Sequence, residues 1–145
     1  MLLETSINPE DSVQTIAPAR EATVLLADMM GISKLYAVAG DLGAVDLITL
    51  CRNGLRDAIQ SEGGRILSTM GERLMALFPT PDSAAAASTR MHLAVEALAP
   101  HDGVRLGLRI AFRHGPVIQR EQEVFGDTVD AAARMLAMTP QMAGS

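Results

Sequence analysis

Acidic residues stand at two positions of the chain from which side chains commonly reach ligands. Asp28 follows residues 23–27, whose unbroken apolar character predicts a central strand covered on both faces, so this carboxylate lies at the C-terminal end of a strand. Glu72 follows Gly71 in a two-residue loop between two apolar runs, which predicts the tip of a β-hairpin. Carboxylates in such places accept hydrogen bonds, move protons or hold hard cations. The ordinary alternatives are a strand-end or helix-capping aspartate for Asp28 and a solvated hairpin tip for Glu72.

An acid and a base are spaced for contact on one helix near the end of the chain. Asp130 and Arg134 lie four positions apart, acid first, in a segment with helical periodicity. This order favours an ion pair on the helix surface, which contributes about 0.2 to 0.5 kcal/mol. A solvated ion pair is therefore one interpretation of these two residues.

The composition disfavours several classes of function. The chain has 145 residues, and its 17 acidic residues outnumber 12 basic ones, giving a formal net charge of -5. That sign is wrong for capture of nucleic acid or an anionic membrane surface, and aromatic residues, at 3%, offer few platforms for stacking bases. One cysteine, Cys51, excludes an intramolecular disulfide and a multi-cysteine zinc cluster. With neither a signal peptide nor a long apolar run in view, we expect a soluble cytoplasmic protein with no nucleic-acid or membrane partner.

The periodicity of the residues predicts one α+β domain around these positions. Residues 1–20 are polar and are expected to form a flexible lead-in, and the domain is expected over residues 21–145. Strands are predicted at 23–27, 65–70, 73–78 and 104–112, and helices at 33–60, 81–98 and 126–138, the first of them broken near Gly40. This order favours a mostly antiparallel sheet with the helices on one face. Arg105, Arg109 and Arg113 alternate with apolar residues and are expected on a solvated strand face, and the alternative is a stripe that faces a partner.

Four segments match one family pattern in order and spacing. They are VLLADMMGIS (24–33), GGRILSTMGERLMALF (63–78), LRIAFRHGPVI (108–118) and VFGDTVDAAARM (124–135). The chain thereby resembles the catalytic domain of class III adenylate and guanylate cyclases over residues 22 to about 138. The resemblance implies a ferredoxin-like βααββαβ sheet. Because the family continues past its last matching helix, the domain is expected to be incomplete at its C-terminus and to lack the family's final strands.

The resemblance also implies a site for a nucleoside triphosphate and two divalent ions. In the family the ribose 3′-hydroxyl attacks the α-phosphorus and pyrophosphate leaves, so the protein mostly positions groups and neutralises charge. Asp28 and Glu72 are implied to hold two Mg²⁺ or Mn²⁺ ions. The backbone implied to receive the triphosphate oxygens is that of Met30, Gly31, Ile32 and Ser33.

The family's site lies between the two protomers of a homodimer, and the second protomer is implied to supply Asp130 and Arg134. Arg134 is implied to meet the charge that develops on the α-phosphate, and Asp130 to stand at the ribose. Ser68 and Glu123 fall at positions that bear on the base. ATP is favoured over GTP, and cyclic AMP over cyclic GMP.

Three of these positions depart from the family pattern. Glu72 replaces an aspartate, Asp130 an asparagine, and Ser68 the lysine that reads adenine in adenylate cyclases. The longer Glu72 moves its carboxylate by about an ångström, and misplacement on that scale costs on the order of 10²-fold in rate. Asp130 adds negative charge beside a polyphosphate. The resemblance therefore implies a signalling cyclase of weak or absent activity, and the alternative is a cyclase-like module that dimerises or binds nucleotide without turnover.

Overall fold

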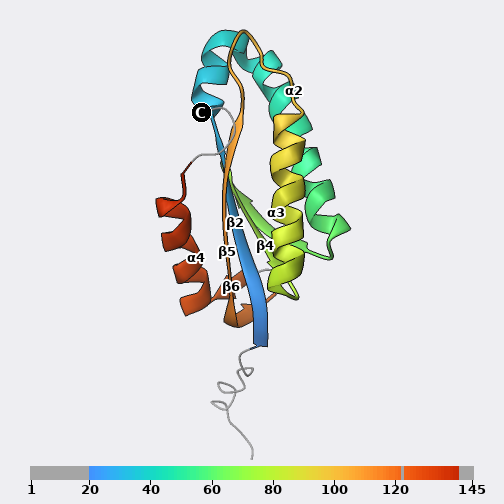
Figure 1. Cartoon of the computed structure of the whole chain (residues 1–145). Coiled ribbons are helices and arrows are strands. Elements are labelled where there is room, and N and C mark those ends of the chain that lie inside the picture. The colour runs from blue at the N-terminus through green and yellow to red at the C-terminus, as the bar shows by residue number, and fades with distance from the viewer. Residues whose placement is uncertain (1–19, 122, 141–145) are drawn as a thin grey trace, which may run out of the picture.

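A five-stranded antiparallel sheet, in the strand order β3-β4-β2-β5-β6, forms the centre of the molecule (Figure 1). The computed structural model describes residues 20–121 and 123–140. In chain order the elements are β2 (Arg20–Met30), α2 (Ile32–Ser61), β3 (Arg65–Met70), β4 (Arg73–Phe78), α3 (Pro81–Glu96), β5 (Gly107–Arg120), β6 (Glu123–Phe125) and α4 (Asp127–Met138). Strand β2 is central because β4 pairs with one of its edges and β5 with the other.

Helices cover both faces of this sheet: α2 and α3 lie on one side and α4 on the other (Figure 1). Successive residues of a strand point to opposite faces. Leu25 and Ala27 accordingly pack in one apolar cluster with α2 and α3, whereas Val24 and Leu26 pack in a second cluster with α4. The predicted α+β class and antiparallel sheet are confirmed, but the expectation that all helices share one face is wrong for α4. The apolar run of β2 needs cover on both sides, and α4 supplies the second.

The predicted hairpin and the kinked helix are confirmed. Strands β3 and β4 have the predicted bounds, and α2 contains one residue with non-helical backbone, Gly40, at φ 73° and ψ 176°. Helix α3 begins after Thr80, whose hydroxyl accepts a hydrogen bond from the Ser83 N–H at 3.0 Å.

Strand β5 differs from the prediction at both ends. It begins at Gly107, because Val104 forms an isolated bridge with His101 around a turn. It then continues to Arg120 and forms a hairpin with β6, a strand that the periodicity does not reveal because it has only three residues. Residues 1–19 of the expected lead-in and residues 141–145 lie outside the described part, and Arg20 already belongs to β2. Among the described helices, none has both the length and the apolar character needed to cross a membrane.

Candidate functional site

The β3–β4 turn, strand β4 and strand β5 all lie beside the C-terminal end of β2. The Met29 N–H donates to the Glu72 carbonyl at 3.0 Å, which places the β3–β4 turn beside the end of β2. In the strand registers, Asp28 is directly opposite Arg73 of β4 on one side and Arg109 of β5 on the other. The side chain of Asp28 lies on the same face of the sheet as those of Val24 and Leu26. The apolar side chains of β2 on that face end before Asp28, and the polar site begins with it.

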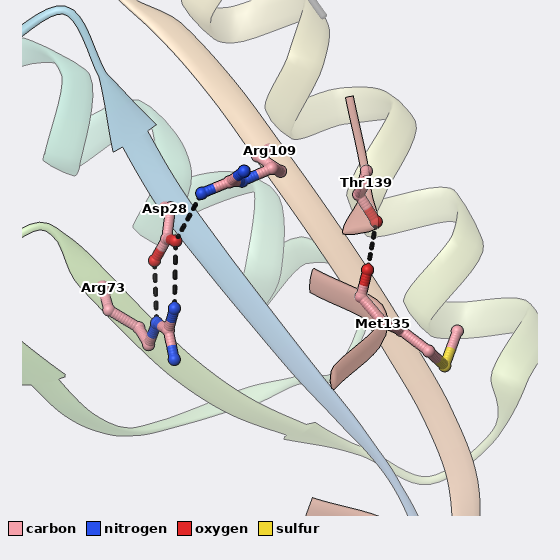
Figure 2. A network of polar contacts seen from close by, with 5 residues as sticks. All are labelled: Asp28, Arg73, Arg109, Met135 and Thr139. Atoms are coloured by element: carbon pink, nitrogen blue, oxygen red, sulfur yellow. Dashed lines mark hydrogen bonds and ion pairs between the residues drawn. The ribbon is translucent and has the colours of Figure 1, made fainter. Parts of the chain in front are cut away.

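Both carboxylate oxygens of Asp28 accept hydrogen bonds from arginines (Figure 2). Arg73 Nε donates to Oδ1 at 2.8 Å and Arg73 Nη2 to Oδ2 at 3.1 Å, a two-pronged contact, and Arg109 Nη2 donates to Oδ2 at 3.4 Å. The exposed fractions of the three side chains are 13% for Asp28, 25% for Arg109 and 45% for Arg73. The hydrogen bonds to Asp28 raise the pKa of Arg73, so its guanidinium stays charged. Asp28 is thus a sheltered carboxylate that lies between two cations.

The site opens into a pocket of about 680 Å³. Its wall consists of the end of β2 with the start of α2, the β3–β4 turn and the approach to β5: Asp28, Met29, Met30, Gly31, Ile32, Ser33, Lys34, Glu72, Arg73, Gly103, Val104, Arg105 and Arg109. Gly31 joins strand to helix at φ 90°, and a Cβ there would meet the Arg105 carbonyl oxygen at 3.1 Å. The first turn of α2 contains no acidic residue, and its N-cap makes no side-chain hydrogen bond. The backbone N–H groups at the start of the helix therefore have no intrahelical acceptor, and the positive end of the helix lies at the pocket.

Six of the ten residues proposed from the sequence line this pocket. They are Asp28, Met30, Gly31, Ile32, Ser33 and Glu72. The other four do not line it: Ser68 on β3, Glu123 on β6, and Asp130 and Arg134 on α4, all exposed. Within the described residues no ion pair joins Asp130 to Arg134, so the surface pair considered from their spacing does not form in this structure.

Four cationic residues of the pocket are absent from the set proposed from the sequence: Lys34, Arg73, Arg105 and Arg109. Arg109 was expected on a solvated face, and this is wrong because the side chain turns to Asp28 across the β2–β5 pairing. Arg105, in contrast, donates from Nη1 to the carbonyl oxygens of Glu96 and Leu98 at 3.3 and 3.4 Å. Cys51 takes no part in the pocket, and burial raises the pKa of its thiol to about 11.

The pocket does not fit a two-ion metal centre in this arrangement. Asp28 and Glu72 offer the oxygen atoms that magnesium and manganese prefer. Arg73, however, occupies both Asp28 oxygens, and no group of three or more His, Cys, Asp or Glu side chains that could hold a metal is present among residues 20–121 and 123–140. The pocket wall also contains four cationic residues, Lys34, Arg73, Arg105 and Arg109, against these two carboxylates, which leaves the pocket with a surplus of positive charge.

Known cyclases are similar to this chain in sequence and fold, although no family model matches the chain. An adenylate cyclase of Streptomyces coelicolor is 30% identical over 122 residues, which are 84% of this chain and 31% of that protein. The structure of an adenylate/guanylate cyclase/hydrolase from Silicibacter pomeroyi superposes with a TM-score of 0.72 and 29% identity, over 86% of this chain and 73% of the other. The guanylate cyclase domain of RhGC from Catenaria anguillulae, in complex with GTP, superposes with a TM-score of 0.72 at 16% identity, over 86% and 77%.

The chain spans about a third of the length of the curated relatives it matches. At 16% identity the likeness to the GTP complex shows the fold alone, whereas the Streptomyces and Silicibacter proteins add similarity of sequence. Taken with the antiparallel sheet and the four matching segments, these similarities place residues 20–121 and 123–140 in the family of class III adenylate and guanylate cyclase catalytic domains.

Proposed function

We propose that this domain binds a nucleoside triphosphate in the pocket at the end of β2 and turns it over weakly or not at all. The observation that carries the proposal is the convergence of Lys34, Arg73 and Arg109 with the start of α2 around one cavity. Its volume of about 680 Å³ lies in the range of small-molecule sites. Cationic side chains and open helix N–H groups are the partners that phosphate oxygens require.

ATP is the nucleotide we propose first, with GTP second. The curated relatives from two Streptomyces species are adenylate cyclases, which supports ATP. The solved domain that holds GTP has the same fold, which supports a nucleoside triphosphate as the class of ligand. Ser68 and Glu123, the residues assigned to base reading, do not line the pocket, so we propose that they contact nucleotide only across a homodimer. We place the domain in the cytoplasm, as its single cysteine favours.

Slow cyclisation is the second candidate function, and the exposure of Arg73 favours it. At 45% exposure this side chain can move into solvent and release Asp28 to a divalent ion, Mg²⁺ or Mn²⁺, together with the exposed Glu72. The reaction forms a bond between the ribose 3′-oxygen and the α-phosphorus and breaks the bond from that phosphorus to pyrophosphate. Asp130 and Arg134 do not line the pocket of their own chain, so the proposed reaction needs a second copy to supply them.

Binding and turnover are tested separately. Calorimetric titration of the chain with ATP, GTP and adenosine should give heat for the two triphosphates, more tightly for ATP, and none for adenosine. Incubation with ATP and Mn²⁺, followed by chromatography for cyclic AMP, should show slow product formation or none. Binding of adenosine as tight as that of ATP would contradict a site that recognises phosphate, and rapid cyclic AMP formation would contradict weak turnover.

A further inference from the structure

Arg73 forms a two-pronged ion pair with Asp28. It is the first residue of β4, the register sets it directly opposite Asp28, and its Nε and Nη2 atoms each meet a different carboxylate oxygen, at 2.8 and 3.1 Å. Because Asp28 is only 13% exposed, its negative charge needs a fixed partner. A divalent ion would supply that partner in a metal site, and here an arginine does.

The pocket keeps a positive surplus without any ion. Its acidic side chains are Asp28 and Glu72, and its cationic side chains are Lys34, Arg73, Arg105 and Arg109, so the cations outnumber the carboxylates by two. The guanidinium of Arg105 donates to carbonyl oxygens at the end of α3, and these bonds leave its charge in place. An anion can therefore enter without first recruiting a cation.

Arg73 also retains donors for a ligand. A guanidinium has five N–H groups, and the two bonds to Asp28 use two of them, which leaves three. Its 45% exposure keeps part of the group accessible from the pocket that it lines. Arg109 lies on the far side of the same carboxylate, so two forked cations flank one point in the pocket.

We propose that Arg73 takes the place of a divalent cation at Asp28, so that the pocket binds the phosphate chain of a nucleoside triphosphate without metal. This inference rests on the proposed function and specifies how the same pocket neutralises its ligand. A metal ion at Asp28 requires the two oxygens that Arg73 holds, so the two compete. Removing Arg73 uncovers a carboxylate beside the phosphates, and binding then becomes dependent on metal.

The test is a calorimetric titration of the full chain with inorganic tripolyphosphate and with ATP, each in EDTA and in Mn²⁺. The unmodified chain should bind both ligands in EDTA, with affinities within about threefold of those in Mn²⁺. Arg73→Gln should lose at least about tenfold in EDTA, or about 1.4 kcal/mol, and should regain that loss in Mn²⁺. Arg73→Lys, which keeps the charge without the fork, should fall between the two.

Arg90→Gln is the matched control. Arg90 is also an exposed arginine in an ion pair, with its Nε 2.6 Å from Glu62 Oε2, and it does not line the pocket. Its replacement should leave every affinity unchanged. Circular dichroism of each variant checks that the fold is kept, and Arg73→Lys carries the comparison if Arg73→Gln unfolds.

The outcomes separate this inference from the function on which it rests. Binding of the unmodified chain in Mn²⁺ but not in EDTA would overturn the role of Arg73 and leave nucleotide binding standing. The same affinity in EDTA for Arg73→Gln and the unmodified chain would also overturn that role. Binding of neither ligand in either buffer would overturn the proposed function and the inference with it.

Discussion

The partners of Asp28 come from far along the chain, 45 residues away for Arg73 and 81 for Arg109. The sequence places Asp28 at the end of a strand and Glu72 on a hairpin tip, and both positions are confirmed. It does not reveal which arginines face Asp28, because that depends on the registers of β2 with β4 and β5. A shift of one residue in either register would turn the arginine to the other face of the sheet.

Replacing Asp28 by asparagine distinguishes a carboxylate that holds metal from one that holds arginines. Asp28→Asn removes a negative charge from the phosphate pocket and frees Arg73, so ATP should bind about threefold to tenfold more tightly in EDTA. The lost ion pair should lower the free energy of unfolding by about 1 kcal/mol, since Arg73 is half exposed. Calorimetry in EDTA and urea denaturation measure the two effects. Weaker binding of ATP in EDTA would show that the carboxylate itself serves the ligand.

His92 on α3 should make stability depend on pH. Burial lowers the pKa of His92, and the charge of Glu96 opposes this more weakly, while the ring Nδ1 is buried with no hydrogen-bond partner among the described residues. The unfolded chain then binds the proton more readily than the folded one, so stability falls as the pH falls through 6.5, the ordinary value for histidine. His92→Gln should lose less stability than the unmodified chain between about pH 7.5 and about pH 5.5.

Urea denaturation at the two pH values measures this difference. An equal loss of stability in His92→Gln and the unmodified chain would contradict the assigned cause.

At the scale of elements, the periodicity locates helices and strands better than it locates the faces they cover. Helix α4 is predicted correctly, and Ala132 and Leu136 on its apolar side are fully buried. Amphipathicity tells which side of a helix is apolar, and it does not tell which face of a sheet that side covers. The unbroken apolar run of β2 contains the missing information, since a strand buried on both faces requires a second layer.

Stability should be sensitive to substitution of Gly31, which connects β2 to α2. Gly31→Ala puts a Cβ 3.1 Å from the Arg105 carbonyl oxygen and forces an L-residue to φ 90°, so it should cost roughly 1 to 3 kcal/mol of stability and weaken ATP binding. Gly40→Ala is the matched control, because its φ is 73° and a Cβ there meets nothing within 4 Å. Thermal unfolding should show a larger loss for Gly31→Ala. Equal losses, with ATP affinity kept in both variants, would contradict a role for the close approach at Gly31.

At the scale of the whole molecule, net charge and local charge have opposite signs. The chain has a formal net charge of -5, which disfavours nucleic acid as a partner, whereas the wall of the pocket at the end of β2 contains four cationic residues and two carboxylates. The composition therefore disfavours nucleic acids and anionic membranes as partners, but it does not predict a site for a small anion. The remaining implied residues, Ser68, Glu123, Asp130 and Arg134, lie outside this pocket, and their contribution from a second copy stays a prediction.

The central claim is that the phosphates of a nucleotide bind at the end of β2, and amide chemical shifts of the ¹⁵N-labelled chain test it most directly. Titration with ATP in EDTA should move the amide signals of residues 28–34, 72–73, 103–105 and 109, which form the pocket wall. Signals from α3, which does not line the pocket, should stay in place. No shifts in the pocket wall at saturating ATP would contradict the claim.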